Sequence, residues 1–217
     1  LITEHIGAYS NGYSLGEIIG RGGTSGIGVF SFDFGGFIVD GGHSLKSKSS
    51  FLPSSASQAK PPQLLAHYDF PDDWEILLVI LDSKNTVNGQ KEVNIFQDYC
   101  PVPKNEVEQT SHIIFMNMIP FLLERDLPAF GHSIDEIQKR GFKNVEVSLQ
   151  SQQIRDLMDK LREIGAYGVG MSSFGPTVYS VFDKNNKHIV EEIKEYVGDR
   201  GIVLTTKAQN YGHEIQK

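Results

Sequence analysis

A glycine-rich loop near the start of the chain holds residue types that could bind an anionic substrate. Five glycines fall between residues 20 and 28. Glycine lets backbone N–H groups approach an anion closely, and a following helix would add free amides and its positive end. A tight structural turn is the alternative interpretation. The loop residues expected to bind substrate phosphate are Arg21, Gly22, Gly23, Thr24, Ser25 and Gly26.

The side chains in this loop extend its binding capacity. Arg21 offers a planar fork of donors that suits phosphate. Thr24 or Ser25 is placed to cap the helix expected after the loop. A short apolar strand is expected over residues 37–40. It ends in Asp40, and Gly41, Gly42 and His43 follow directly. A carboxylate, two glycines and a histidine at one strand end are more typical of an active-site edge than of a hairpin.

Composition limits the class of protein. The chain has 217 residues, of which 39% are hydrophobic and 22% charged, and these values are typical of a globular protein. It contains neither a run of 18 apolar residues nor a basic, apolar leader, so we expect a soluble cytoplasmic protein that does not associate with membranes. The net charge of -7 argues against nonspecific nucleic-acid binding. Cys100 is the single cysteine, which excludes an internal disulfide and a cysteine-based zinc site.

The segments around the loops indicate two regions. A short helix is expected within residues 8–19, before the glycine loop. Residues 44–62 are rich in serine, lysine and proline, which predicts a solvated linker or a mobile lid that closes over an anion with Lys46, Lys48 and Lys60. The expected domains are residues 1–62 and residues 63–217. The chain starts at Leu1 without methionine, and we expect that an upstream portion is absent.

The second region has a mixed pattern of strands and helices. Residues 74–82 predict a central strand covered on both faces. A capping box at 105–108 predicts a helix bent at Pro120, with Met116 and Met118 in the core, and a similar signal predicts a helix start at 133–136. The remaining expected elements are an extended piece at 142–148, a helix at 151–164, strands on both sides of the loop within 167–183, a helix at 187–197 and a strand at 202–205. This order predicts an α+β fold whose C-terminal part is a ferredoxin-like sandwich.

Two motifs resemble known proteins. Gly170-Met-Ser-Ser-Phe-Gly-Pro-Thr-Val-Tyr179 resembles the third motif of the GHMP-kinase superfamily, which pairs a ribosomal-S5-like N-terminal domain with a ferredoxin-like C-terminal domain. The loop at 20–30 together with Gly36 to His43 resembles the archaeal β-ribofuranosylaminobenzene 5′-phosphate synthases of that superfamily. In this family Glu4-His5-Ile6-Gly7 should continue into a Gly-Leu-Gly-Ser phosphate loop, whereas here Ala8-Tyr9-Ser10 follows. The resemblance therefore predicts that a segment is missing at this point and that residues 1–62 are a remnant of the S5-like domain.

The resemblance implies a transferase of methanopterin biosynthesis. It would join 5-phosphoribosyl 1-pyrophosphate to 4-hydroxybenzoate or 4-aminobenzoate, with loss of carbon dioxide and pyrophosphate, and Mg²⁺ would accompany the substrate. Asp40 could bind the metal, stabilise positive charge on the ribose or accept a proton, and His43 is the other candidate base. The family resemblance also adds Ser172, Ser173 and Gly175 to the candidate substrate-binding residues, beside Gly41 and Gly42.

Other interpretations stay open at this stage. The structural alternatives are that Asp40 caps Gly42 in a turn, that His43 only orients Asp40, and that the two serines only form a strand-to-loop turn. An ATP-dependent GHMP-type kinase and a non-enzymatic small-molecule-binding module are the competing functions. A homodimer is compatible with the sequence but is not predicted by any specific feature.

Overall fold

The computed structural model describes residues 11–44, 46–48, 50–56, 59–82, 87 and 89–214. The chain divides into two compact units. The first unit contains Leu1–Phe70, Asn88–Cys100 and Gln209–Lys217, and the second contains Pro71–Val87 and Pro101–Ala208. The predicted segment at residues 4–10 lies outside the described residues. The units differ from the predicted division at residue 62, because strand β2 (Leu64–Tyr68) pairs antiparallel with β1 (Phe37–Asp40).

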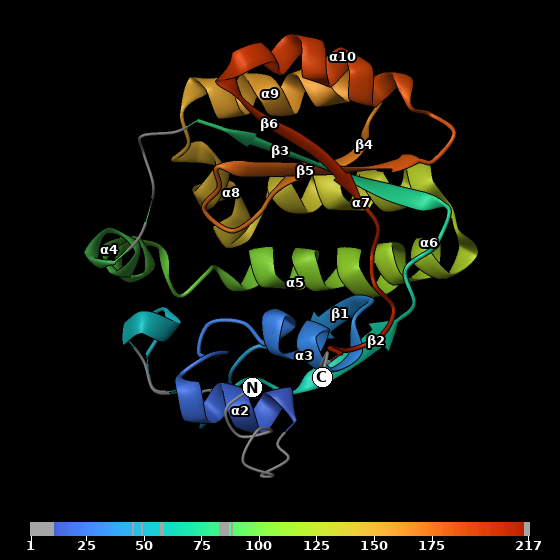
Figure 1. The fold of residues 1–217 in the computed structure, drawn as a ribbon. Helices are drawn as coiled ribbons and strands as arrows, with labels where there is room; N and C mark the ends of the chain where they lie inside the picture. Colours follow the sequence, from blue (N-terminus) through green and yellow to red (C-terminus); the bar gives the residue numbers. More distant parts are fainter. Residues whose placement is uncertain are drawn as a thin grey trace. The chain divides into compact units, whose positions relative to one another are not determined.

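Within its described residues, the first unit combines the helices α2, α3 and α4 with this two-stranded sheet (Figure 1). Helix α2 (Gly12–Ile19) begins where the Asn11 side chain accepts a hydrogen bond from the Ser14 N–H, and it ends at Gly20 in the left-handed conformation. Helix α3 (Ile27–Phe34) follows the glycine loop. The helix expected before the loop and the strand at 37–40 are confirmed. The unit also holds a short 3-10 turn, η1 (Ser54–Ala56), and helix α4 (Gln90–Tyr99).

The second unit contains a four-stranded antiparallel sheet in the order β4-β5-β3-β6. The strands are β3 (Trp74–Leu81), β4 (Tyr167–Met171), β5 (Thr177–Asp183) and β6 (Gly201–Thr206). Along the chain, β3 is followed by helices, the β4-β5 hairpin, α10 (His188–Val197) and β6. This order and pairing are those of the ferredoxin-like sandwich, so the predicted fold of this part is confirmed.

The core of the second unit lies between the sheet and two amphipathic helices. Helices α9 (Gln152–Glu163) and α10 cover one face of the sheet, and α7 (Leu127–Gln138) packs against β4 and β5 (Figure 1). The predicted apolar face of α9 is confirmed by four side chains that are almost fully buried, Ile154, Leu157, Met158 and Leu161. Along β3, buried Leu77 and Val79 alternate with half-buried residues, so one face of this central strand is more deeply covered than the other.

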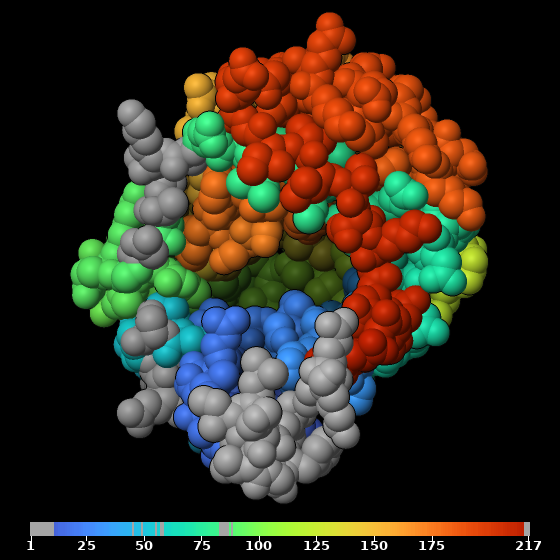
Figure 2. Space-filling model, in the orientation of Figure 1, coloured from blue at the N-terminus to red at the C-terminus, as the bar shows by residue number. Residues whose placement is uncertain are grey.

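Edge strand β6 carries apolar side chains at the surface. Ile202 is 57% exposed and Leu204 is 49% exposed. In the space-filling view of Figure 2, the strand and the residues that follow it are the red segment at the end of the chain.

Within the described residues, no helix has both the length and the apolar character needed to span a membrane.

The predicted helix at the 105–108 capping box is partly wrong. Helix α5 (Lys104–Ile113) begins after Pro103, without a side-chain cap. It continues through a π-helical turn, η2 (Ile114–Met118), into α6 (Ile119–Glu124). The irregular turn directly precedes Pro120, whose missing N–H disrupts regular helical hydrogen bonding. Met118 is buried as expected, but Met116 is 63% exposed and is therefore not a core residue.

Two further elements differ from their predictions. The helix expected to start at Ser133 starts at Leu127, because the Asp126 side chain accepts a hydrogen bond from the Ala129 N–H. Ser133 lies inside this helix and its hydroxyl donates to the Ala129 carbonyl. Residues 142–148 are not extended but form helix α8 (Gly141–Ser148). Its β-branched valines favour a strand locally, and tertiary packing overrides that preference.

Candidate functional site

The glycine loop joins α2 to α3 in the first unit, and its shape depends on close backbone approach. Gly22 has a φ of 87°, and a Cβ added there would lie 2.7 Å from the ring of Pro61. A larger residue would therefore be strained at this position and would also displace the proline. Ser25 Oγ accepts a hydrogen bond of 3.2 Å from the Ile27 N–H, next to the first turn of α3. Gly26, and not Thr24 or Ser25, is the residue at the N-cap itself.

Asp40 fills the anion-binding position of this loop. Its Oδ2 accepts hydrogen bonds of 2.8 Å from the Ser25 hydroxyl and 2.8 Å from the Gly26 N–H. Its Oδ1 accepts one of 2.9 Å from the Gly42 N–H. The carboxylate thus ties the end of β1 to the N-terminus of α3, where the helix dipole also favours a negative charge. The turn with Gly42 that the sequence left as an alternative is present, and Asp40 has a structural role in addition to the predicted chemical one.

A second carboxylate occupies the other helix N-terminus of this region. Asp33 Oδ1 accepts a 2.6 Å hydrogen bond from the N–H of Gly12, the first residue of α2. A Cβ added to Gly12 would lie 2.8 Å from the same oxygen. Both helix starts near the glycine loop are therefore neutralised by side chains of the chain itself.

The 44–62 segment is attached to the glycine loop by specific contacts. Lys48 Nζ donates to the carbonyl of Gly23 and, at 2.5 Å, to the carbonyl of Leu52. Thr24 Oγ1 accepts a 2.7 Å hydrogen bond from the Ser54 N–H. Lys60 forms a 2.7 Å ion pair with Glu17 of α2. These contacts favour a structural role for two of the three predicted lid lysines, whereas the predicted movement of the segment stays a prediction.

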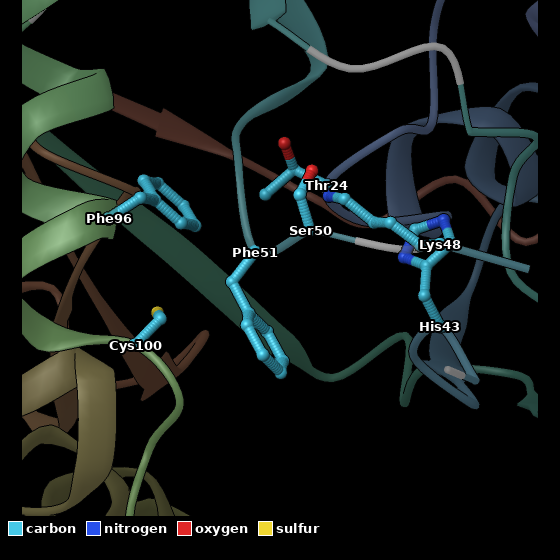
Figure 3. Close-up of a pocket in the computed structure, with 7 residues that line it drawn as sticks. All are labelled: Thr24, His43, Lys48, Ser50, Phe51, Phe96 and Cys100. Atoms are coloured by element: carbon cyan, nitrogen blue, oxygen red, sulfur yellow. The ribbon is translucent and has the colours of Figure 1, made fainter. Parts of the chain in front are cut away.

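A pocket of about 220 Å³ lies within the first unit, beside the glycine loop (Figure 3). In this view Phe51, Phe96 and Cys100 gather on the side opposite His43. Phe96 and Cys100 come from α4 and its C-cap. The pocket therefore joins residues from the loop, the 44–62 segment and a helix more than forty residues further along the chain. Its lining residues are Thr24, His43, Lys48, Ser50, Phe51, Phe96 and Cys100.

His43 lies at this pocket with a defined ring orientation. Its Nε2 is 2.8 Å from the carbonyl oxygen of Lys60. A carbonyl can only accept, so Nε2 carries the proton and Nδ1 of the neutral ring holds a lone pair. The ring can therefore accept a proton at Nδ1 while the backbone fixes the opposite nitrogen.

Burial changes the titration of the two reactive groups in the pocket. Burial lowers the pKa of Lys48, and the negative charge of an ionised Cys100 partly offsets this. Burial likewise raises the pKa of the Cys100 thiol, and the ammonium of Lys48 partly offsets that shift. The charge of each group thus shifts the pKa of the other, so Lys48 and Cys100 interact electrostatically.

The described residues contain no group of three or more His, Cys, Asp or Glu side chains that could surround a metal ion. This arrangement does not fit a dedicated protein cage for Mg²⁺. It does fit an ion that arrives on substrate phosphates and needs one or two protein carboxylates. Asp40 is the candidate ligand, since its Oδ1 accepts only one hydrogen bond from the chain.

The third-motif residues lie in the second unit, in the hairpin loop between β4 and β5. Ser172 and Ser173 are exposed, and the Ser172 carbonyl accepts a 2.9 Å hydrogen bond from the Gly175 N–H. Two side chains from helix α8 and its C-terminal end hold the loop. Lys143 Nζ donates to the carbonyls of Met171 at 3.1 Å and Ser173 at 3.4 Å, and Gln150 donates to the Phe174 carbonyl at 2.7 Å.

The candidate residues thus fall into separate groups. Asp40 meets Ser25, Gly26 and Gly42, whereas Thr24 and His43 line the pocket. Arg21 is exposed, and no side-chain hydrogen bond or ion pair joins it to another described residue. Sequence reasoning missed Phe51 and Phe96, since single aromatic residues in a serine-rich segment and a helix carry no local signal of a shared pocket. The roles in binding or catalysis that were predicted for the candidate residues stay predictions.

The fold of the second unit matches a known family. The family described as "GHMP kinases C terminal" matches residues 118–202, all of which lie in this unit. A homoserine kinase from Cytophaga hutchinsonii superposes with a TM-score of 0.64 at 16% identity, covering 97% of this chain and 62% of that chain. A mevalonate diphosphate decarboxylase from Enterococcus faecalis gives a TM-score of 0.56 at 14% identity, covering 94% and 60%. Residues 118–202 are therefore similar to the C-terminal domain of this family, and the solved structures show that the fold is shared.

Sequence similarity gives a narrower relationship. The chain is 50% identical over 212 residues to the β-ribofuranosylphenol 5′-phosphate synthase of Methanothermobacter thermautotrophicus, covering 98% of this chain and 64% of that protein. It is 46% identical over 222 residues to the synthase of the same name from Methanocaldococcus jannaschii, covering 99% and 66%. The resemblance to these synthases that the two glycine motifs indicated is confirmed. The chain spans a little under two thirds of the length of these relatives.

Proposed function

We propose that this chain belongs to an enzyme that joins 5-phosphoribosyl 1-pyrophosphate to 4-hydroxybenzoate in methanopterin biosynthesis. The observation that carries the proposal is the 50% identity to a named synthase over almost the whole chain. The relatives are named for a phenol product, which favours 4-hydroxybenzoate over 4-aminobenzoate as the acceptor. Soluble small-molecule substrates of this kind suit a cytoplasmic enzyme.

The proposed reaction balances without a further reactant. The ring carbon that bears the carboxylate forms a bond to C1 of the ribose, and the C1–oxygen bond to pyrophosphate breaks with its electron pair leaving on pyrophosphate. The bond to the carboxyl carbon then breaks, and its electron pair restores the aromatic ring as carbon dioxide leaves. The phenol proton can leave during attack and return afterwards. Mg²⁺ on the phosphates would neutralise the charge of the leaving pyrophosphate.

The residues of the first unit suit individual parts of this reaction. Arg21 is an exposed donor beside a loop of backbone amides and can pair with a phosphate. Asp40 places a fixed negative charge at the same loop, where it can stabilise positive charge on the ribose. His43 presents Nδ1 as an acceptor for the phenol proton, because Lys60 holds its other nitrogen.

A GHMP-type kinase is the second candidate function, and it has less support. The homoserine kinase and the mevalonate diphosphate decarboxylase that share the fold are 16% and 14% identical to this chain, which is evidence for the fold alone.

The proposed function is tested with 4-hydroxybenzoate that carries an isotope label on its carboxyl carbon. We expect labelled carbon dioxide only when 5-phosphoribosyl 1-pyrophosphate and Mg²⁺ are both present, with pyrophosphate released in equal amount. ATP in place of the phosphoribosyl donor is the matched control and should release no label. Phosphate transfer from ATP to a small molecule, without decarboxylation, would replace the proposal by the kinase. Light scattering of the same preparation tests the homodimer that the sequence leaves open.

A further inference from the structure

We propose that the pocket lined by Phe51, Phe96 and Lys48 binds the ring and carboxylate of a planar aromatic acid. The inference rests on the proposed function, because it assigns the acceptor of that reaction to a defined place. Nothing in the sequence motifs points to this pocket, since its walls come from segments far apart in the chain.

The aromatic residues give the pocket its preference for a flat ligand. Phe51 is 49% exposed although it lines a concave site, so a ligand that covers its ring would remove apolar surface from water. Phe96 lines the same pocket from helix α4. A ligand with an aromatic ring can pack against these side chains in the offset-stacked or edge-to-face arrangements that aromatic pairs prefer. The volume of about 220 Å³ is below the ~300 Å³ that begins the range of drug-sized sites, which suits an acid with one ring.

Lys48 supplies the charge that an aromatic acid needs. An ammonium has three N–H donors, and two of them reach the carbonyls of Gly23 and Leu52. The third can donate to a ligand carboxylate. Among the described residues, no Asp or Glu acts on the charge of Lys48, and an ionised Cys100 is the one group that offsets its desolvation. A bound carboxylate would compensate for the desolvation that lowers the pKa of Lys48.

The position of the pocket also suits an acceptor. Thr24 lines it and precedes Ser25, whose hydroxyl donates to Asp40. An aromatic acid in the pocket would therefore lie beside the loop proposed to receive the phosphoribosyl donor. His43 lines the same pocket and keeps Nδ1 as an acceptor, which suits a ligand with a phenol group.

Cys100 offers a direct test because it is the single cysteine and lines the pocket. The rate of its alkylation by iodoacetamide should fall when a ligand fills the site. If the bound ligand blocks the thiol completely, the rate falls by a factor of 1 + [L]/Kd, or about elevenfold at ten times Kd. The probe is 4-hydroxybenzoate. Cyclohexanecarboxylate keeps the charge without the flat ring, and 4-hydroxybenzyl alcohol keeps the ring without the charge, so both should protect at least tenfold more weakly.

Two variants test separately the contact of the ligand ring with Phe51 and the contact of the ligand carboxylate with Lys48. Phe51→Leu and Lys48→Met should each weaken protection by 4-hydroxybenzoate by about tenfold, or ~1.4 kcal/mol. Lys91→Met, at an exposed lysine of α4, is the control and should leave protection unchanged. Lys48 also holds backbone carbonyls, so Lys48→Met can disturb the fold. In that case the Phe51→Leu variant, together with the comparison of the three ligands on the unmodified protein, still tests the proposal.

The outcomes separate this inference from the proposed function. Equal protection by cyclohexanecarboxylate, or no protection at all in a preparation that releases carbon dioxide, would overturn the pocket assignment and leave the function standing. Selective protection in a preparation that never forms the product would support the pocket and overturn the function.

Discussion

The glycine-rich loop at 20–28 and the hairpin loop at 172–176, which contains one glycine, are both fixed by a lysine but have different hydrogen-bond acceptors around them. Each is fixed through its carbonyls by a lysine, which is Lys48 for the loop at 20–28 and Lys143 for the hairpin loop after β4. They differ on the N–H side. In the first loop, the Gly26 N–H and the Ser25 hydroxyl donate to the carboxylate of Asp40. At the end of β4, by contrast, the Met171 N–H donates to the neutral amide oxygen of Gln138 at 3.1 Å.

This difference changes the meaning of a glycine-rich sequence. Glycines make backbone amides accessible, but the neighbouring side chains decide whether an external anion can use them. In the first loop an internal carboxylate already accepts from the Gly26 N–H, so the proposed substrate phosphate would have to bind beside Asp40. Beside the second loop, the ammonium of Lys143 on α8 forms an ion pair with the buried carboxylate of Glu146. Its charge therefore compensates a carboxylate inside the second unit.

The largest expected effect comes from removing the lysine of the second loop. Lys143→Met should lower the free energy of unfolding by ~3 kcal/mol, because it leaves the carboxylate of Glu146 buried without its cation and releases two carbonyls. Urea unfolding measures this change. Lys160→Met removes an ion pair with the exposed Glu163 and should cost less than ~1 kcal/mol. Equal losses in both variants would contradict the importance given to Lys143.

High pH should destabilise the second unit in a predictable window. Desolvation of its hydroxyl, followed by the negative charges of Asp135 and Glu146, raises the pKa of Tyr179 to about 12 from 10.0. Between these two values the unfolded chain loses the proton while the folded chain keeps it, so stability falls as pH rises. The loss should reach ~2–3 kcal/mol near pH 12. Tyr179→Phe should remove this part of the pH dependence, and an unchanged slope would contradict the assignment.

The carboxylate of the first loop should matter for stability as well as for chemistry. From the sequence alone, Asp40→Asn keeps the side-chain shape and should leave stability nearly unchanged. The structure revises that expectation, because all three partners of Asp40 are donors and an amide NH₂ would face at least one of them. We expect a loss of ~2 kcal/mol. Asp98→Asn, at an exposed site on α4, is the control and should change thermal unfolding very little.

Glycines within the first loop should respond according to their backbone angles. Gly22→Ala should cost ~1–2 kcal/mol, because its φ is 87° and Pro61 occupies the space of a Cβ. Gly28→Ala should be neutral or stabilising by ~0.5 kcal/mol, since this residue lies in α3 with open space around it. A matching response at the two positions would mean that the loop shape does not depend on Gly22.

The fold was predictable where one element carried its own signal. The near-continuous apolar run of β3 and the helical spacing of Ile154, Leu157, Met158 and Leu161 identified the core of the second unit. Strand β2 and helix α4 were missed. Helix α4 has one buried residue, Ile95, and β2 has no fully buried residue, so neither carries a strong periodic pattern. The strand exists because its backbone pairs with β1, which is a long-range effect.

The site was predictable only in its chemical types. The strand end at Asp40 was located from the sequence, but its partners were not, since Ser25 and Gly26 reach it through the fold of the loop. Lys48 was expected to lie in a solvated linker or in a lid that closes over an anion, and the structure shows it bound to two backbone carbonyls. The pocket between the 44–62 segment and α4 depends on contacts that no local pattern records.

The central claim is that Asp40 acts in the reaction and not only in the loop. The direct measurement is turnover of Asp40→Asn at a temperature well below its own unfolding transition, where the variant is fully folded. Carboxyl-labelled 4-hydroxybenzoate and 5-phosphoribosyl 1-pyrophosphate are the substrates, and Asp98→Asn is the control. The account predicts a loss of ~100-fold or more in turnover by the folded variant, within the range usual for electrostatic or acid–base groups. Full turnover by the folded variant would contradict it and would leave Asp40 with a structural role alone.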